Sequence, residues 1–264
     1  MIQFNLQKKT ELVLGSLKSK AYPSRIFDNK VLNFLDDVSK EIFKNKINHN
    51  YTDLVAFGFW CRKSNLLKIS KDYKTKEFLI GRGHVFHVVP SNVPMNFSYS
   101  LSFGLLSGNV NIIRLPSRRF VQIDIFCKIL KKILKKKNYS SIKNKICLIR
   151  YDRSDEISKK LSSMADARLL WGGDQTINQF KKYPTSPRCV DLSFSNRYSI
   201  SIIDLNKISK CSNSELTNLA TKFYNDSYLM DQQGCSSPQA IFWLGKKNKT
   251  VKKKFWNILA SIVE

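Results

Sequence analysis

Apolar residues recur along the chain at two different spacings, and the change of spacing divides it into regions. Between residues 25 and 67 they stand three or four positions apart, which is typical of helices with one buried face. This spacing predicts a helix over residues 25–43 and a second helix, denser in apolar residues, over residues 51–67. Residues 1–80 are therefore expected to form a mostly helical N-terminal region.

From residue 85 onward, short apolar runs alternate with helical patterns. Strand, helix and strand joined by short links form a right-handed crossover unit of a parallel sheet. The pattern therefore predicts a doubly wound α/β domain over residues 81–190. Its predicted strands are residues 85–89, 111–115, 146–150 and 168–171, and its predicted helices are residues 95–106, 120–137, 156–164 and 175–182.

The regular spacing of apolar residues is then interrupted and resumes further along the chain. Residues 183–197 contain prolines and show no clear period, so we expect them to be irregular. The change of domain is placed near residue 190, which leaves residues 191–264 as a second, smaller α/β domain. Its predicted strands are residues 198–204 and 239–244, and its predicted helix is residues 214–229.

The formal net charge of +25 at pH 7 indicates either an anionic binding partner or a bias in amino-acid composition. Clustered lysines and arginines can bind the phosphate backbone of a nucleic acid, so a basic nucleic-acid-binding protein is one alternative. The lysine clusters here are spread over separate predicted elements, and lysine, asparagine and isoleucine are all abundant, which indicates a bias of composition. Nucleic acid is therefore not the expected partner, although a positive field would attract an anionic substrate.

Other features narrow the class of protein. The six cysteines are scattered without a CxxC pair and there are only three histidines, so neither a metal site nor a disulfide framework is expected. No apolar run approaches the roughly 18 residues that a membrane span requires. The first residues lack the pattern of a signal peptide, so a cytoplasmic location is expected.

One cysteine stands in a short polar loop between two strongly patterned segments. Cys235 follows Gly234, after the predicted helix over residues 214–229 and before the predicted strand over residues 239–244. Reactive residues concentrate in loops held by a rigid scaffold, and a glycine lets the backbone approach a substrate closely. A lone cysteine is more often a small buried apolar residue. The local sequence alone leaves both interpretations open.

Three stretches in order along the chain resemble the acyl-CoA reductase family of the aldehyde dehydrogenase superfamily, to which the fatty-acid reductase of bacterial bioluminescence belongs. They are HVVPSNVP at residues 87–94, GNVNIIRLPS at residues 108–117 and DQQGCSSP at residues 231–238. The similarity runs from about residue 50 to the last residues. It implies an aldehyde-dehydrogenase-like fold, with a cofactor domain followed by a catalytic domain. It also implies an NADPH-dependent enzyme that reduces a fatty acyl-CoA to the fatty aldehyde.

The resemblance assigns catalytic roles to three residues. Cys235 would be the nucleophile that becomes S-acylated, and Asn92 would donate its side-chain amide to the tetrahedral oxyanion. Asn92 could equally be a turn-forming residue between two prolines. Asp191 stands roughly where hydrolytic aldehyde dehydrogenases carry a glutamate that activates water. A reductase that releases aldehyde needs no such water, so a catalytic carboxylate and a surface or capping carboxylate both remain open.

The resemblance also places the cofactor, at the carboxyl ends of the predicted parallel strands where ligands of such sheets bind. Pro116 and Ser117 follow the second predicted strand, and Arg114, near its end, would contact the ribose or 2′-phosphate of the cofactor. An extra leucine before Pro116 departs from the commonest pattern of the superfamily. Gly172 and Gly173 follow the fourth predicted strand and would let backbone amides approach a phosphate. They could instead be a capping turn with the next aspartate as N-cap.

Chains of the family continue well past the cysteine, whereas this sequence ends at Glu264. We therefore expect an incomplete catalytic domain, in which the strand over residues 239–244 has an incomplete sheet around it. Unpaired edges and exposed apolar faces associate, so a second copy or a complementing polypeptide is the expected protein partner. The alternative to an active enzyme is a non-catalytic or split remnant of one. A helix face without an obvious place to be buried is expected from Phe255, Trp256, Ile258 and Leu259.

Overall fold

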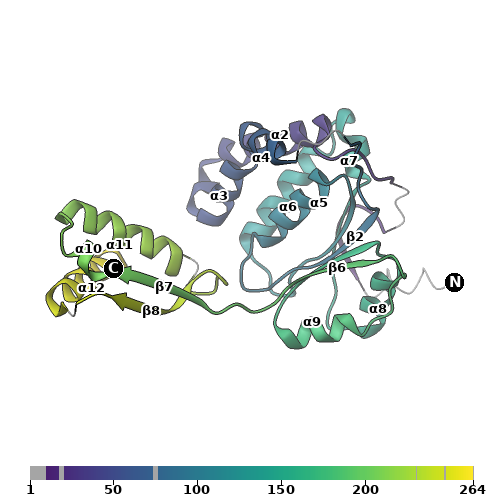
Figure 1. Cartoon of the computed structure of the whole chain (residues 1–264). Helices are drawn as coiled ribbons and strands as arrows, with labels where there is room; N and C mark the ends of the chain where they lie inside the picture. Colours follow the sequence, from purple (N-terminus) through teal and green to yellow (C-terminus); the bar gives the residue numbers. More distant parts are fainter. Residues whose placement is uncertain (1–9, 18–20, 74–76, 230, 247, 264) are drawn as a thin grey trace. The chain divides into compact units, whose positions relative to one another are not determined.

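The computed structural model describes residues 10–17, 21–73, 77–229, 231–246 and 248–263. The chain divides into two compact units, Met1–Ser195 and Asn196–Glu264. They are called here the sheet unit and the C-terminal unit (Figure 1). The division falls a few residues beyond the predicted change near residue 190. No helix among the described residues is long and apolar enough to cross a bilayer.

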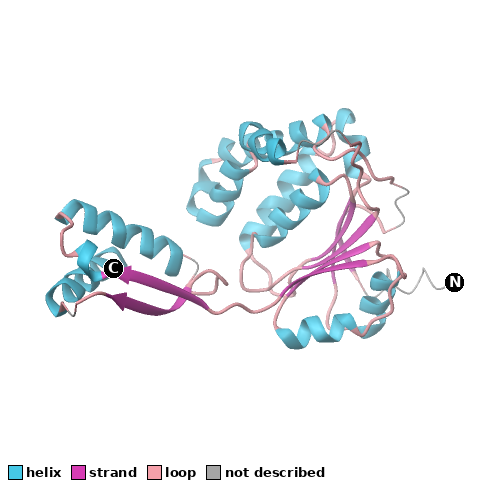
Figure 2. Ribbon diagram, in the orientation of Figure 1, coloured by secondary structure: helices cyan, strands magenta, loops and turns pink. Residues whose placement is uncertain are grey.

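The sheet unit is built on a sheet of six strands among the described residues, in the order β1–β4–β3–β2–β5–β6 (Figure 2). β2 to β6 are parallel, and β1 runs antiparallel along β4. The inner strands are mostly apolar because helices cover both of their faces. The doubly wound α/β domain is therefore confirmed. The strands are β1 (Glu11–Leu14), β2 (His84–Val88), β3 (Val110–Arg114), β4 (Ile146–Arg150), β5 (Ala167–Trp171) and β6 (Val190–Phe194).

Helices enclose the sheet from both sides, with α5 and α6 over one face and α8 and α9 over the other (Figure 1). The N-terminal helices α2, α3 and α4 pack on the outside of α5 and α6. The helical segments of the sheet unit are α2 (Asn29–Lys44), η1 (Lys46–Asn50), α3 (Thr52–Trp60), α4 (Lys63–Asp72), α5 (Asn96–Leu106), α6 (Val121–Ile133), η2 (Lys137–Tyr139), α7 (Ser140–Lys143), α8 (Asp155–Ser163) and α9 (Asp174–Lys181).

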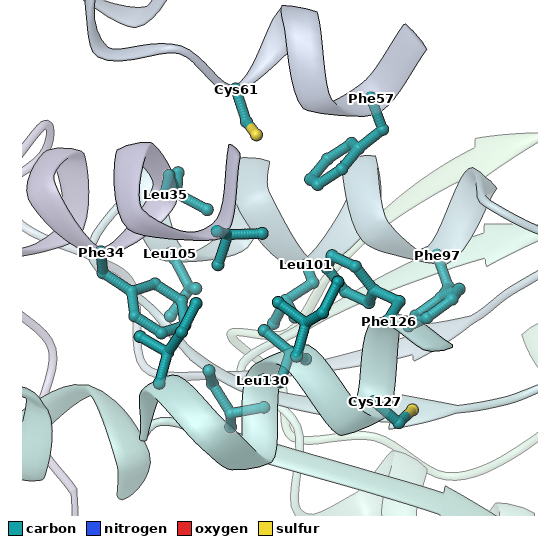
Figure 3. Packing of buried hydrophobic residues seen from close by; sticks show 14 of the residues in the cluster. Phe34, Leu35, Phe57, Cys61, Phe97, Leu101, Leu105, Phe126, Cys127 and Leu130 are labelled. Carbon is teal, nitrogen blue, oxygen red and sulfur yellow. The ribbon is translucent and has the colours of Figure 1, made fainter. Parts of the chain in front are cut away.

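The main core lies between the N-terminal helices and α5 and α6 (Figure 3). Phe57 of α3 packs edge-on against Phe126 of α6, with ring centroids 5.3 Å apart, and Phe97 of α5 lies 5.4 Å from the same ring. These rings are almost completely buried. Edge-to-face pairs of this kind add to the free energy gained by burial. The N-terminal helices are therefore an integral layer of the sheet unit.

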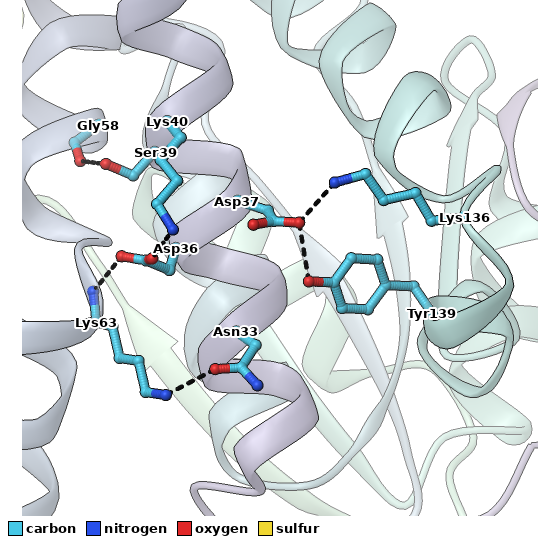
Figure 4. A network of polar contacts seen from close by, with 9 residues as sticks. All are labelled: Asn33, Asp36, Asp37, Ser39, Lys40, Gly58, Lys63, Lys136 and Tyr139. Carbon is cyan, nitrogen blue, oxygen red and sulfur yellow. Dashed lines mark hydrogen bonds and ion pairs between the residues drawn. The ribbon is translucent and has the colours of Figure 1, made fainter.

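Polar contacts fix α2 to its neighbours (Figure 4). Asp36 accepts a hydrogen bond from the backbone N–H of Lys63 at 2.9 Å, and Asp37 accepts one from the hydroxyl of Tyr139 at 3.0 Å. The buried hydroxyl of Ser39 donates to the carbonyl of Gly58 at 2.6 Å. Exposed ion pairs contribute little to stability, so the buried hydrogen bond is the stronger tie between α2 and α3. This group of carboxylates is structural.

Three parts of the sheet unit differ from the sequence predictions. The mostly helical N-terminal region also contains the strand β1, which pairs with β4. The single helix predicted over residues 51–67 is wrong, because the chain breaks at Cys61 and Arg62 into α3 and α4. The irregular segment predicted over residues 183–197 is wrong for β6. β1 and β6 lie at the two edges of the sheet and are mostly exposed, so their sequences lack the apolar run that marks a buried strand.

The C-terminal unit contains two parallel strands with helices packed on one of their faces. β7 (Ser199–Asp204) pairs with β8 (Pro238–Leu244), and among the described residues no other strand joins them. The predicted strands over residues 198–204 and 239–244 are therefore confirmed. The predicted lack of burial for the last helix is wrong, because Phe255 and Leu259 are almost fully buried in a separate core. The helices are α10 (Leu205–Ile208), α11 (Asn213–Ser227) and α12 (Lys249–Val263).

Candidate functional site

The carboxyl ends of β3, β2 and β5 lie side by side at one edge of the sheet. Arg114 is in register with Val88, and Val88 is in register with Leu170. The chain order of the strands reverses at β2, with β3 and β4 on one side of it and β5 and β6 on the other. Ligands of such sheets bind at this switch point. The structure thus brings together three predicted parts of the site: the loop of Asn92, the loop of Pro116 and Ser117, and the glycine pair.

A buried polar network holds the two elements that flank the loop of Asn92. His87 of β2 is completely buried, with its Nδ1 2.8 Å from the hydroxyl of Ser100 in α5. Its Nε2 lies 3.0 Å from Oδ1 of Asn111 in β3, while Nδ2 of Asn111 donates to the carbonyl of Asn109. Because Oδ1 only accepts, Nε2 carries the proton and Nδ1 accepts from Ser100. The network needs Gly104, where a Cβ would lie 1.9 Å from Oδ1 of Asn111.

This network predicts a loss of stability in mild acid. Burial lowers the pKa of His87 to about 4, below its ordinary value of 6.5. The unfolded chain therefore takes up a proton as the pH falls from 6.5 towards 4, and the folded chain does not. Stability is complete above pH 6.5, and about 2 kcal/mol of it is lost between pH 7 and pH 5. Urea unfolding at the two pH values measures this loss.

The comparison variants are His87→Gln, which cannot titrate, and His49→Gln, which removes an exposed histidine. The loss between pH 7 and pH 5 should be smaller by about 2 kcal/mol in His87→Gln and unchanged in His49→Gln. An equal loss in all three proteins would show that groups other than His87 cause it.

The loop after β3 is anchored by β4. Arg114 lies over the ring of Tyr151, with its guanidinium carbon 4.4 Å from the ring centroid. Arg150 is buried and donates from Nε to the carbonyl of Pro116 at 3.2 Å. Leu115, the residue that departs from the superfamily pattern, is itself buried, and its N–H donates to a carbonyl of β4. Ser117, in contrast, is exposed. The loop therefore presents a positive charge and a hydroxyl from a fixed backbone.

The glycine pair stands where β5 enters α9. The N-cap of α9 is Gly173, so the alternative in which Asp174 caps the helix is wrong. No side chain caps this helix end, and its first N–H groups can bind an anion. A Cβ at Gly172 would lie 3.2 Å from Thr176, so a larger residue would crowd this turn. An uncapped helix start at the same edge of the sheet as Arg114 suits the phosphates of a dinucleotide, so these residues fit the expected cofactor.

Asp191 is held inside the sheet by an arginine. It lies near the amino end of β6, in register with Arg168 of β5. Nε and Nη2 of Arg168 donate to its two carboxylate oxygens at 2.7 and 2.6 Å, and Nη1 donates to the carbonyl of Phe180 at 2.8 Å. Arg168 is 2% exposed. The structure therefore does not place Asp191 at the carboxyl edge with the other predicted site residues.

Cys235 lies in the C-terminal unit, in the loop between α11 and β8. Its side chain is exposed, and its carbonyl accepts a hydrogen bond from the hydroxyl of Ser199 at 2.7 Å. Asp231 and Gln232, which lead into the loop, have φ values of 48° and 58°. Such left-handed conformations are uncommon for residues other than glycine and persist where the surrounding structure imposes them. The loop is therefore a defined turn that presents a thiol to solvent.

The other five cysteines are not accessible in this way. Burial raises the pKa of Cys61, Cys127 and Cys147 to about 12, and it also raises the pKa of Cys189. Cys211 is half-buried. The thiolate is the reactive form of cysteine, and a buried neutral thiol is inert. Exposure thus singles out Cys235 for covalent chemistry.

Some residues that shape the site were missed in the sequence. His87 and Asn111 lie within predicted strands, and Arg150 and Arg168 lie at the end or the start of one. The available signal was a polar side chain inside a run that should be buried, because such a side chain requires a partner. The identity of each partner depends on the order of the strands in the sheet, which the pattern does not give.

Comparison with known proteins identifies the family. Residues 61–264 match the model of the family described as acyl-CoA reductase (LuxC). The long-chain acyl-protein thioester reductase of Aliivibrio fischeri is 29% identical over 175 residues, which cover 62% of this chain and 32% of that protein. Long-chain acyl-protein thioester reductase 2 of Photobacterium leiognathi is 24% identical over 286 positions, which cover 91% of this chain and 55% of that protein. The chain thus spans about half or less of the length of these relatives.

Solved structures share the fold. An aldehyde dehydrogenase from Bartonella henselae superposes with a TM-score of 0.63 at 15% identity, over 89% of this chain and 51% of that chain. The glyceraldehyde-3-phosphate dehydrogenase GapN of Methanocaldococcus jannaschii, complexed with NADP, superposes with a TM-score of 0.62 at 14% identity, over 89% of this chain and 53% of that one. The aldehyde-dehydrogenase-like fold is therefore confirmed. Because the family model matches most of the sequence, the chain belongs to the acyl-CoA reductase (LuxC) family.

Proposed function

We propose that this chain takes the acyl group of a long-chain acyl thioester onto Cys235 and takes part in its reduction to the fatty aldehyde with NADPH. The observation that carries the proposal is the exposed thiol of Cys235 in a defined loop, in the stretch that resembles the family. The names of the relatives support a long-chain acyl thioester as substrate, attached to a protein. The description of the family supports acyl-CoA as a second donor.

The covalent step needs a thiolate and a donor for the oxyanion. Sγ of Cys235 attacks the carbonyl carbon of the thioester, and the carbonyl oxygen gains the negative charge. The tetrahedral species then collapses, the bond to the leaving thiolate breaks, and an S-acyl cysteine remains. Asn92 would donate its side-chain amide to the oxyanion, together with the backbone N–H of Cys235. Asp191 has no part in this acyl transfer.

Residues at the carboxyl edge of the sheet would hold the cofactor. Arg114 and Ser117 would bind the ribose or its 2′-phosphate, with Pro116 fixing the loop between them. Gly172 and Gly173 would let the first N–H groups of α9 bind the pyrophosphate. When bound, the reduced nicotinamide supplies the hydride that converts the S-acyl group into aldehyde and thiolate. These residues come from β3 and β5, which lie on either side of β2, and their loops share the carboxyl edge of the sheet, which supports a site for a dinucleotide across that edge.

The proposal is tested by treating the purified chain with tetradecanoyl-CoA or with a tetradecanoyl thioester on a carrier protein. Intact-mass measurement counts the acyl groups, and peptide mapping finds the cysteines that carry them. The expected result is one acyl group, on Cys235. Absence of acylation with both donors, or acylation spread over several cysteines, would overturn the assignment.

Replacing Asn92 with alanine is expected to slow acylation without unfolding the sheet unit. Loss of one oxyanion donor typically costs about 3 kcal/mol, which is on the order of a hundredfold in rate. The measurement is the single-turnover rate of acyl transfer from tetradecanoyl-CoA. Ser91→Ala changes an exposed residue of the same loop and should leave that rate unchanged. An equal rate in Asn92→Ala and the unmodified chain would show that Asn92 only forms a turn and does not stabilise the oxyanion.

A further inference from the structure

A cavity of about 550 Å³ lies in the sheet unit, away from the edge that carries the candidate site. Residues 25–30, which lead into α2, form one side of it, and Ser70 and Tyr73 at the end of α4 form another. Leu79 lines it from the segment that precedes β2, so this wall lies towards the amino ends of the strands. The volume is within the range of small-molecule sites, which is about 300 to 1,000 Å³.

The backbone around the cavity is fixed by hydrogen bonds. The N–H of Ile26 donates to the carbonyl of Leu79 at 3.2 Å. Phe27 has a φ of 48°, a left-handed conformation that is uncommon for residues other than glycine, and its N–H donates to the carbonyl of Leu106 at 2.7 Å. Such conformations persist where the surrounding structure imposes them, and they cluster at functional sites. The cavity is therefore preformed, as ligand sites usually are.

The charges that line the cavity are balanced. Arg25 and Lys30 contribute two positive charges, and Asp28 and Glu77 contribute two negative charges. This balance contrasts with the whole chain, in which lysines and arginines outnumber carboxylates by 45 to 20. Among the described residues, no ion pair joins Arg25 or Lys30 to a carboxylate. The two cations therefore have hydrogen-bond donors available for an anionic group of a ligand.

Two helix ends of opposite polarity meet at the cavity. Residues 25–30 include the N-terminus of α2, whereas Ser70 and Tyr73 belong to the last turn and the C-cap of α4. The N-terminus of a helix attracts negative charge, and the C-terminus attracts positive charge. The helix ends and the lining side chains thus both favour a ligand that carries the two signs of charge at once.

The cavity also has an apolar part. The rings of Phe27 and Tyr73 lie 5.6 Å apart between centroids, and the side chains of Ile26 and Leu79 line the same cavity. We propose that this cavity binds a small zwitterion with an apolar side chain, of the α-amino-acid class. Its carboxylate lies at the start of α2 with the two cations, and its ammonium lies at the end of α4. The site goes beyond the proposed function, which uses the carboxyl edge of the sheet and Cys235.

The first test compares L-leucine with two molecules that each carry only one of its charges. Isocaproate lacks the ammonium group, and isopentylamine lacks the carboxylate. Binding to the full chain is measured by calorimetry, and L-leucine should bind at least about tenfold more tightly than either, because each charged hydrogen bond adds to affinity. Isocaproate that binds as tightly as L-leucine, or no binding of L-leucine at millimolar concentration, would overturn the inference.

Two pairs of variants assign the binding to the cavity. Lys30→Met should weaken L-leucine binding by at least about tenfold, whereas Lys68→Met, which removes an exposed lysine of α4 outside the lining, should bind normally. Ser70→Trp should abolish binding by filling the cavity, and Ser70→Ala should retain it. Circular dichroism shows which variants fold, and the lysine pair decides the question if Ser70→Trp does not. Unchanged affinity in Lys30→Met or in folded Ser70→Trp would contradict the proposal.

A leucine analogue with a diazirine in its side chain locates the bound ligand. After irradiation, crosslinks are expected on peptides that contain residues 25–30 or Tyr73, and excess L-leucine should prevent them. Crosslinks confined to other peptides would place the ligand elsewhere and end the proposal. Cys235→Ala should give the same crosslinks, because the cavity lies in the sheet unit and needs no thiol. Failure of the proposed function therefore leaves this result unchanged.

Discussion

Replacing Cys235 with alanine is expected to reduce acyl transfer from a long-chain thioester to the background of the assay. The other five thiols are less accessible: burial raises the pKa of Cys61, Cys127 and Cys147 to about 12 and also raises that of Cys189, and Cys211 is half-buried. Loss of a nucleophile removes the covalent route itself, so the expected decrease in rate is at least about a thousandfold. The measurement is the acylated fraction over time by intact mass. Cys235→Ser should also be inactive, because a hydroxyl without an adjacent base is a weak nucleophile at neutral pH.

The matched control is Cys211→Ala, which removes a half-buried thiol from the same unit. Cys211 packs at the edge of the core of the C-terminal unit, and its Sγ lies 3.6 Å from the carbonyl of Lys207, so its loss should cost a little stability and leave acylation unchanged. Acylation of Cys235→Ala at the rate of the unmodified chain would show that another residue is the nucleophile. The peptide map of that variant would then identify it.

The sequence predicted the parallel part of the sheet and the helices over it because burial on both sides leaves a mostly apolar run in each inner strand. The sequences of the edge strands β1 and β6 contain no such apolar run. Val190 and Leu192 of β6 are partly exposed, and between them Asp191 pairs with Arg168 across the sheet, a contact of high sequence separation. The prediction that the apolar face of the last helix is not buried was wrong for a related reason. Phe255 is buried by α11 and the two-stranded sheet, and a periodic pattern cannot show that a matching surface exists elsewhere in the chain.

In the predicted site too, the sequence indicated the residues that follow the strands but not the distant residues that support them. Asn92 and the glycine pair each follow a predicted strand and Arg114 lies near the end of one, and the sheet order brings all three to one edge, as a parallel sheet requires. The supports of these loops were not predictable in the same way. Arg150 reaches the carbonyl of Pro116, and His87 reaches Ser100, only because particular strands and helices became neighbours. Residue types at loop positions therefore indicated chemistry, whereas the structure was needed to show what holds those positions.

Asp191 can be interpreted as a structural partner of Arg168 or as a catalytic carboxylate, and the two interpretations predict different effects of its substitution. As a partner of Arg168, it neutralises a guanidinium that is 2% exposed and that, within the part of the chain the structure describes, otherwise donates to the carbonyl of Phe180. As a catalytic group, it would act on the acyl group at the site. The contacts favour the first role, because both of its carboxylate oxygens are occupied by Arg168. We therefore expect substitutions of Asp191 to change the stability of the sheet unit much more than its chemistry.

Asp191→Asn is expected to lower the free energy of unfolding by about 4 kcal/mol, because it leaves the charge of Arg168 buried without a counter-ion. Arg168→Met should cost less, since Asp191 is partly exposed and water can solvate its carboxylate. The double variant should then be more stable than Asp191→Asn alone, by about 2 kcal/mol, because it no longer buries an unpaired charge. Urea unfolding of the three variants measures these differences, with Asp152→Asn as the control for an exposed carboxylate. If Asp191→Asn instead unfolds like the unmodified chain and loses acyl transfer or reduction, the ion pair is incidental and the carboxylate is catalytic.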